Sequence, residues 1–404
     1  MHDHPLIVFM AAIILVYGIV SKRAEKTIFT APMIFVLIGL LAGFFGFELL
    51  YQGPKAQLVK PIAEFTLILV LFIDGTTVDR SKLFAEKSIP IRLLFIGLPL
   101  TMILGFMAAI PLFPQVGILP ILLMALILAP TDAALGQAVV TSDKVPLNIR
   151  QSINVESGLN DGFALPPILI CMAILSEKSN ASYDFSYWST FIIKQFLFGP
   201  IIGGFVGWLA GIMIEKASKA DWISHTYQML ASIAIAVLSY FLAETFGGNG
   251  FIAAFVAGVM LGTQTEIIRE KIREFGEAEA QIFIMFIFLL FGLLLVPMSY
   301  SNWDWKVLLY AILSLTLIRM APVALSLYGS GLDIKSIAFI GWFGPRGIAS
   351  VLYLLMAVIQ LGSEGYETII AVISLTVLLS IFLHGITAVP FSKLFEKNKS
   401  LYSK

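Results

Sequence analysis

Two interrupted apolar stretches decide the predicted fold: Leu128-Ala129-Pro130-Thr131-Asp132 and Gly341-Trp342-Phe343-Gly344-Pro345-Arg346-Gly347. Each lies in the middle of a segment long enough to span a membrane. Each contains a proline, which removes a backbone donor and clashes with the preceding helical turn. Matching interruptions in the two halves of a chain are typical of inverted-repeat transporters, whose broken helices meet at the substrate site. We therefore expect two broken helices that cross inside the membrane.

A charged residue accompanies each interruption. Each end of a helix carries about half a unit of charge, so Asp132 can lie against positive N-terminal ends and Arg346 against negative C-terminal ends. A single proline kink is a common structural feature of membrane helices. Two kinks, each with a charge of the appropriate sign, favour a transport site.

The composition excludes a soluble protein. Of 404 residues, 58% are hydrophobic and only 13% are charged, with a mean hydropathy of +0.92, whereas an average soluble domain is about 25% charged. The 26 basic and 26 acidic residues balance, so no global field attracts nucleic acid, and the lipid bilayer is the expected partner. The single cysteine, Cys171, excludes a disulfide framework and a cysteine-based metal site.

Apolar segments of about 20 residues, the length that crosses a bilayer, predict an all-α integral membrane protein with thirteen transmembrane helices. We place these spans at residues 5–21, 31–50, 58–78, 89–110, 117–141, 150–175, 187–213, 226–245, 247–263, 280–298, 305–328, 336–360 and 367–390.

The positive charges orient these spans. The predicted loops on one side, with their boundary residues and the C-terminal tail, carry 19 of the 26 Lys and Arg residues, and the loops on the other side carry 4. Cytoplasmic loops are enriched in Lys and Arg. We therefore expect the N-terminus outside and the C-terminus in the cytoplasm, which requires an odd number of spans. No linker or soluble domain is expected.

The sixth predicted span carries a dense polar cluster: Glu156, Ser157, Asn160 and Asp161. Residues four apart share one helix face, so all four lie on one face. Asp161 is eleven residues from Arg150, roughly 16 Å into the bilayer and near its midplane. A charge at this depth costs about 2.5–3.5 kcal/mol, which favours a functional role over a structural network.

Other spans contribute further ionisable residues to the same slab of the membrane: Asp74, Asp132, Arg319 and Arg346. Scattered over lipid-facing surfaces they could not be accommodated. We therefore expect them to face one common polar cavity.

A carboxylate in such a cavity can bind either a proton or a small cation such as Na⁺ or Li⁺, because burial disfavours its uncompensated charge and oxygen ligands suit these cations. With access from alternate sides, this competition is sufficient for cation/proton exchange without a cofactor or an enzymatic step. Arg319 does not deprotonate, so it can neutralise Glu156 permanently. Asp161 is then the main titrating group, which predicts one proton per cation and no net charge movement.

Three alternatives remain open at this point. Oxygen ligands alone do not reveal cavity radius, so a K⁺/H⁺ exchanger on the same scaffold is a close alternative. A cation channel would need a continuous polar stripe or a carbonyl filter, whereas the sequence shows a closed cluster at one depth. An intramembrane peptidase would need paired acids, and the sequence places no second carboxylate within assured reach of Asp161.

Three motifs resemble the NhaP-type sodium/proton antiporters of the monovalent cation/proton antiporter family. They are Glu156-Ser157-Gly158-Leu159-Asn160-Asp161, Thr131-Asp132 in a broken helix, and Phe343-Gly344-Pro345-Arg346-Gly347. The resemblance spans nearly the whole chain, and the first and third motifs together are highly specific. It implies a homodimer in the cell membrane, in which a mobile core slides against a dimerisation domain in an elevator-like cycle.

The resemblance also implies a division of the chain. Spans 1–3 (residues 1–80) and 8–10 (217–300) would form the dimerisation domain. Spans 4–6 (81–176) and 11–13 (301–404, with a short cytoplasmic tail) would form the core, and span 7 (177–216) would connect the two.

By the same resemblance, the transported Na⁺ would be held by Asp161, Ser157 and the backbone carbonyl of Thr131. Asp132 would help through water, and Asn160 stands beside the principal acid. No resident cofactor is implied.

Two further roles follow from the resemblance. An acid on the third span would contribute from the dimerisation side, and its counterpart is Asp74, although the family often has glutamate there. Direct ligation by the shorter side chain therefore stays open. Glu156 would pair with Arg319, with Arg346 as the less favoured partner.

Overall fold

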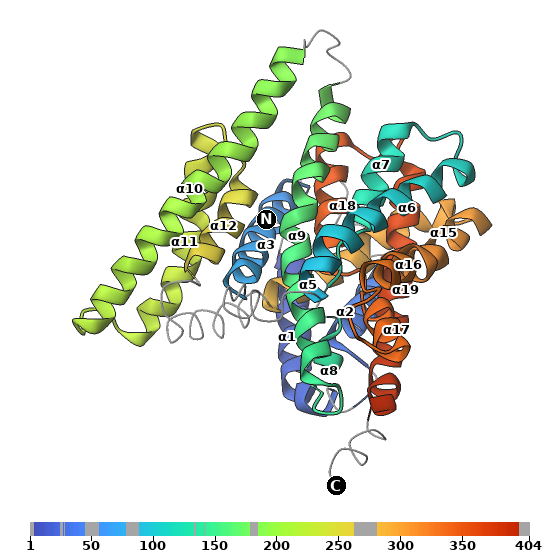
Figure 1. Cartoon of the computed structure of the whole chain (residues 1–404), viewed down its shortest axis with the longest axis horizontal. Coiled ribbons are helices and arrows are strands. Elements are labelled where there is room, and N and C mark those ends of the chain that lie inside the picture. The colour runs from blue at the N-terminus through green and yellow to red at the C-terminus, as the bar shows by residue number, and fades with distance from the viewer. Residues whose placement is uncertain are drawn as a thin grey trace.

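The computed structural model describes residues 4–24, 27, 29–44, 56–77, 89–132, 135–140, 142–177, 185–261 and 281–395. Its regular elements are helices, and no β-strand occurs within these ranges (Figure 1). The predicted all-α class is therefore confirmed. The predicted loops 79–88 and 264–279 and the tail beyond residue 395 lie outside the described ranges.

The helices follow one another in this order: α1 (His4–Ala24), α2 (Ala31–Phe44), α3 (Ala56–Thr77), α5 (Ile89–Arg92), η2 (Leu93–Gly97), α6 (Leu98–Leu112), α7 (Ile118–Ile127), α8 (Gln137–Val140), α9 (Leu147–Glu177), α10 (Phe185–Lys219), α11 (His225–Thr245), α12 (Gly250–Leu261), a helix over 281–290, η3 (Phe291–Leu295), α14 (Val296–Ser299), η4 (Tyr300–Asn302), α15 (Trp305–Leu315), α16 (Leu317–Ser326), α17 (Ile334–Trp342), α18 (Ile348–Leu361), α19 (Glu367–Ser392) and η5 (Lys393–Phe395).

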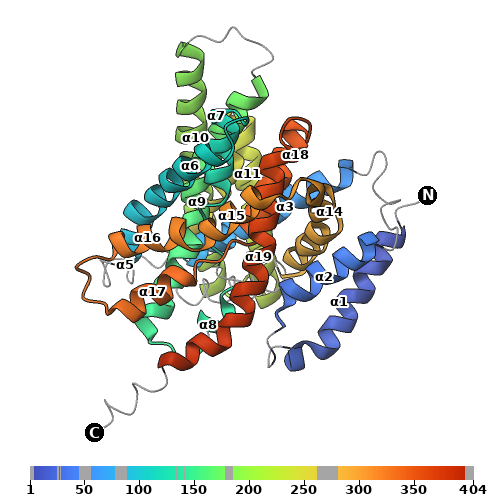
Figure 2. The same ribbon diagram turned by 90° about the vertical axis from the view of Figure 1, so that its right-hand side faces the viewer.

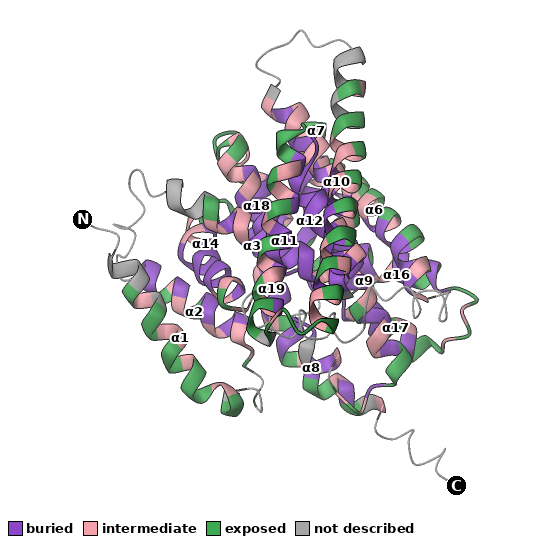
Figure 3. Cartoon of the chain, turned by 90° about the vertical axis from the view of Figure 1, so that its left-hand side faces the viewer, coloured by how far each residue is buried: buried purple, intermediate pink, exposed green. Residues whose placement is uncertain are grey.

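Many of these helices can cross a membrane. Among the described residues, seven continuous helical runs have the length and apolar composition of membrane spans, and four shorter apolar helices accompany them. Large apolar side chains such as Ile193, Ile201 and Phe205 are exposed along α10, and Figure 3 shows exposed surface on α1, α10 and α11 around a buried centre. Such a surface suits lipid. The count of thirteen spans stays a prediction.

Both predicted interruptions are confirmed. The first separates α7 from α8, because the chain leaves the helix after Ile127. The second separates α17 from α18 between Trp342 and Ile348. The two non-helical segments meet, since the backbone N–H of Asp132 donates to the carbonyl oxygen of Pro345 at 2.8 Å.

A third discontinuity was not predicted. α15 ends and α16 begins around Thr316, whose backbone angles (φ −115°, ψ −94°) are not helical. No glycine or proline marks this position in the sequence, so the local pattern held no signal for it. The break lies one turn before Arg319 and therefore affects the direction in which that side chain leaves its helix.

Glycines set the close packing around α12. A Cβ added at Gly203 or Gly207 of α10 would overlap the α12 backbone at Ala253 or Ala257. On another face, a Cβ at Gly258 of α12 would overlap the backbone of α3 at Phe72. Small residues allow membrane helices to approach this closely.

A second crossing of the same kind joins α2 to η3, where Gly39 and Gly292 each face the partner's backbone. Figure 2 shows α2 beside α14, at the edge of the molecule that also holds α1.

Candidate cation site at the crossing of two broken helices

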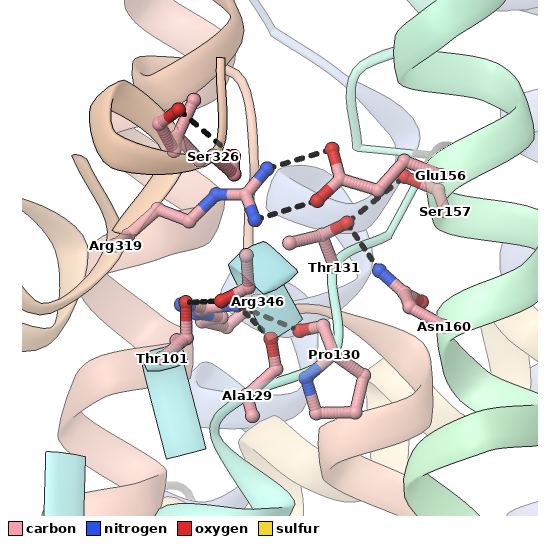
Figure 4. Close-up of polar contacts among 12 residues, drawn as sticks. Thr101, Ala129, Pro130, Thr131, Glu156, Ser157, Asn160, Arg319, Ser326 and Arg346 are labelled. Atoms are coloured by element: carbon pink, nitrogen blue, oxygen red, sulfur yellow. Dashed lines mark hydrogen bonds and ion pairs between the residues drawn. The ribbon is translucent and has the colours of Figure 1, made fainter. Parts of the chain in front are cut away.

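Side chains from the other broken helix cap the C-terminal end of α7. Arg346 donates from Nη1 to the carbonyl oxygens of Ala129 and Pro130, the latter at 3.0 Å (Figure 4). Ser350 of α18 donates from Oγ to the carbonyl oxygen of Ile127 at 2.8 Å. The last carbonyl groups of a helix have no partner within the helix, so a buried guanidinium is well placed here.

The beginning of α18 receives the complementary charge. The backbone N–H of Ile348 donates to Oδ2 of Asp132 at 2.7 Å, and Asp132 is only 6% exposed. A carboxylate at this position balances the positive end of the helix. Gly347 allows the approach, because a Cβ there would overlap the carboxylate.

Glu156 of α9 and Arg319 of α16 form a buried ion pair. Nη1 and Nη2 of Arg319 donate to the two carboxylate oxygens at 2.6 and 2.8 Å (Figure 4). The two side chains are 2% and 1% exposed. The Arg319 guanidinium also lies against Gly344, where a Cβ would overlap it. The structure thus pairs Glu156 with Arg319, and it places Arg346 on carbonyl groups instead.

Thr131 links the first interruption to α9. Asn160 donates from Nδ2 to Oγ1 of Thr131 at 2.6 Å, and the Thr131 and Ser157 hydroxyls share a hydrogen bond of 3.1 Å. All three side chains are buried, and Figure 4 shows them converging from the extended segment and from one face of α9. These contacts place a hydroxyl group, the Asn160 amide and the backbone of the first interruption next to Asp161.

Asp161 itself is 4% exposed, and its Oδ1 has no hydrogen-bond partner among the described residues. The same is true of Oδ1 of Asn160. The acidic charges that act on Asp161 are those of Asp74, on α3, and Asp132. Two buried oxygen acceptors without donors, close to further acidic groups, form an environment that favours a bound cation or proton.

The acids do not converge on a single point. In the part of the chain that the structure describes, no three His, Cys, Asp or Glu side chains are grouped closely enough to hold a metal ion. Asp74 is half-buried, and its charge acts on Asp161 from α3. Its role as a direct ligand stays a prediction.

Two buried hydroxyl groups near the site were not predicted from the sequence. Tyr353 of α18 donates from its phenol to the backbone carbonyl oxygen of Asp161 at 3.1 Å, and Ser350 caps α7 as described above. Ser350 and Tyr353 lie on α18, four and seven residues after Arg346. In the sequence, these two residues are marked only by their position on a helix that begins at the interruption. That position does not distinguish either of them from an ordinary packing residue.

Comparisons with known proteins identify the family and the fold. A family model described as "Sodium/hydrogen exchanger, transmembrane" matches residues 10–394. The structure superposes on that of the sodium proton antiporter MjNhaP1 from Methanocaldococcus jannaschii with a TM-score of 0.77 and 21% identity, covering 98% of this chain and 100% of the other. This similarity shows that the two proteins share a fold.

Curated relatives include both Na⁺ and K⁺ transporters. A Na⁺/H⁺ antiporter of Schizosaccharomyces pombe is 26% identical over 324 residues, which cover 73% of this chain and 68% of the relative. The K⁺/H⁺ antiporter NhaP of Alkalimonas amylolytica is 26% identical over 344 residues, 84% of this chain and 58% of the relative. The chain thus spans about 58–68% of the length of these relatives. It belongs to the sodium/hydrogen exchanger family, whose members are multi-pass membrane cation/proton antiporters rather than enzymes.

Proposed function

We propose that this protein exchanges Na⁺ or Li⁺ for H⁺ across the cell membrane, by competition of the two ions for Asp161. The observation that carries the proposal is the environment of this side chain. Its Oδ1 is buried without a hydrogen-bond partner in the described part of the protein, and Oδ1 of the adjacent Asn160 has the same character. Leaving such atoms unsatisfied is costly, and a proton or a cation bound to the carboxylate removes that cost.

The cation is held by Asp161, Ser157 and the backbone carbonyl of Thr131, with Asp132 and Asp74 adding negative charge nearby. The buried contact between the Thr131 and Ser157 hydroxyls supports this ligand set, because it brings the extended segment to within hydrogen-bonding distance of α9. Hard cations prefer oxygen ligands, and this arrangement offers carboxylate, hydroxyl and carbonyl oxygens together.

Exchange is electroneutral, with one proton for one cation. Both carboxylate oxygens of Glu156 accept hydrogen bonds from Arg319, and arginine stays protonated throughout a transport cycle. Asp132 is held by the N-terminus of α18. Among the acids of the core helices this leaves Asp161 as the group that gains and loses a proton, and with Asp74 keeping its charge throughout the cycle the charge carried in each direction is equal.

Alternating access arises from sliding of the core (81–176 and 301–404) against the dimerisation domain (1–80 and 217–300), with 177–216 between them, in a homodimer whose N-terminus lies outside and whose C-terminus lies in the cytoplasm. The glycine-mediated packing of α3 against α12 supports a rigid dimerisation domain. α3 also packs against α9 and α18. Asp74 is therefore on the helix by which the dimerisation domain contacts the mobile core.

K⁺/H⁺ exchange is the second candidate, because curated relatives of comparable identity carry the name K⁺/H⁺ antiporter. The two functions are separated by reconstituting the full chain in proteoliposomes and following internal pH after addition of Na⁺, Li⁺ or K⁺. We expect a pH change with Na⁺ and Li⁺ and little with K⁺.

The same vesicles test electroneutrality. An imposed membrane potential, with no cation gradient, is expected to drive no proton movement. Exchange driven by voltage alone would contradict the one-for-one stoichiometry, and conductance at fixed pH would indicate a channel.

A further inference from the structure

His384 lies within α19 and is 1% exposed. Its Nε2 is 2.8 Å from the carbonyl oxygen of Trp342, the last residue of α17. A carbonyl oxygen only accepts hydrogen bonds, and we assign the ring hydrogen to Nε2, which makes the shorter of the two contacts of the ring to carbonyl oxygens and donates to Trp342. His384 therefore satisfies a carbonyl group at the C-terminal end of α17, as Arg346 does beyond the C-terminal end of α7.

The second ring nitrogen is connected, through Ser380, to a residue within the same interruption. Nδ1 of His384 is 3.1 Å from Oγ of Ser380, one turn earlier on α19. Nδ1 also lies 2.9 Å from the backbone carbonyl oxygen of Ser380. In a neutral ring with its hydrogen on Nε2, Nδ1 accepts from the Ser380 hydroxyl, which is the only one of these two groups that can donate. That hydroxyl oxygen also accepts from the backbone N–H of Arg346 at 2.7 Å. One turn of α19 thus holds the residue before the break, Trp342, and a residue within it, Arg346.

Trp342 is held by a third residue on this face. Its Nε1 donates to Oγ1 of Thr387 at 2.9 Å, and its ring lies 5.1 Å from the imidazole ring, centroid to centroid. Ser380, His384 and Thr387 are spaced four and three residues apart, so they lie on one face of the helix. We call these three residues the α19 clamp.

We propose that the α19 clamp positions the cation site, with His384 as its central positioning residue. The inference rests on the proposed function. The clamp fixes the segment 343–347, and Arg346 in that segment holds the carbonyl groups of Ala129 and Pro130. The next residue, Thr131, is bonded to the polar face of α9. Loss of the clamp therefore moves the oxygen atoms around Asp161, although His384 touches no ion.

The test compares half-saturating cation concentration with maximal rate in proteoliposomes that contain the full chain, using the alkali cation that the wild type transports best. His384→Leu removes both hydrogen bonds at similar volume. Since loss of a residue that orients ligands typically costs 10–100-fold in ion affinity or activity, we expect its half-saturating concentration to rise about 10-fold or more. His384→Gln keeps an N–H donor that can reach Trp342, so a smaller rise is expected.

Thr376→Ala is the matched control. Thr376 is buried on the same helix, and its hydroxyl donates to the carbonyl oxygen of Val372, within α19, at 2.7 Å. This variant is expected to keep the wild-type half-saturating concentration. A role for His384 in stability alone would lower the yield and the maximal rate but leave half-saturation unchanged, and that result would overturn the proposal.

If His384→Leu does not accumulate as a monodisperse protein, Ser380→Ala decides. It removes the hydroxyl that joins the imidazole to Arg346, and a several-fold rise in half-saturating concentration is expected, whereas a wild-type value would overturn the proposal.

Wild-type protein in the same vesicles separates the proposed function from the positioning role of His384. Absence of cation-driven exchange there would refute the proposed function, and normal wild-type exchange with unaltered variants would refute only the positioning role.

Discussion

Two acids on α9, Glu156 and Asp161, lie five residues apart and are almost equally buried, at 2% and 4% exposure. Their surroundings are opposite. Both carboxylate oxygens of Glu156 are held by Arg319, whereas Oδ1 of Asp161 has no hydrogen-bond partner in the described structure.

The difference shows that burial alone does not identify a transport group. A carboxylate that is fully paired with an arginine cannot release its partner without leaving a buried charge. A carboxylate that lacks donors is free to exchange one bound ion for another. We therefore assign a structural role to Glu156 and the exchange of ions to Asp161, and the following variants test this contrast.

The largest effect on transport is expected from Asp161→Asn. An amide carries no charge and binds no proton, so cation/proton exchange in proteoliposomes should fall to the background of empty vesicles. The protein should still elute as a single species in size-exclusion chromatography, because Oδ1 has no hydrogen bond within the described structure to lose. Transport at the wild-type rate would end the proposed mechanism.

Glu156→Ala should act on stability instead. It leaves Arg319 as an unpaired buried charge, and breaking a buried ion pair in this way costs about 3–5 kcal/mol of unfolding free energy. Equilibrium unfolding in mixed micelles measures the loss. Glu156→Gln serves as the comparison, since an amide oxygen can still accept one hydrogen bond from the guanidinium and the loss should be smaller. Equal stability of Glu156→Ala and wild type would contradict the structural role.

Ser157→Ala should have an intermediate effect on ion binding. It removes one oxygen next to Asp161 and leaves the Glu156 pair intact, so the half-saturating Na⁺ concentration should rise about 10-fold, which corresponds to about 1.4 kcal/mol. The maximal exchange rate, extrapolated to saturating Na⁺, should stay near that of the wild type. An unchanged half-saturating concentration would remove Ser157 from the ligand set.

The smallest effect is expected from Ser350→Ala. The variant removes the hydrogen bond to the carbonyl oxygen of Ile127 at the end of α7, and a single buried hydrogen bond contributes about 1 kcal/mol. A slightly lower thermal midpoint with unchanged half-saturating Na⁺ would show that the Arg346 contacts are sufficient to hold this helix end. A large rise in half-saturating Na⁺ would instead make Ser350 part of the positioning network.

Much of the site could be predicted from local patterns. Pro130 and Pro345 interrupt apolar segments, and the proximity of Glu156 to Asn160 follows from helix geometry alone. The break at Thr316 could not be predicted, because no residue type at that position favours it. His384 was not predicted either: in the sequence it is one of four scattered histidines, and its partners Trp342 and Ser380 become neighbours only when α19 packs against the interruption.

The sequence by itself determined the class of the protein, the positions of the two interruptions and the set of intramembrane charges, because hydrophobicity, proline and helix periodicity act over a few turns. Only the tertiary structure decided which charge faces which partner: Arg319 on Glu156, Arg346 on the carbonyl groups after α7, and Asp132 at the start of α18. These choices join residues more than 150 positions apart. They depend on how helices cross in a medium where every buried polar group needs a partner.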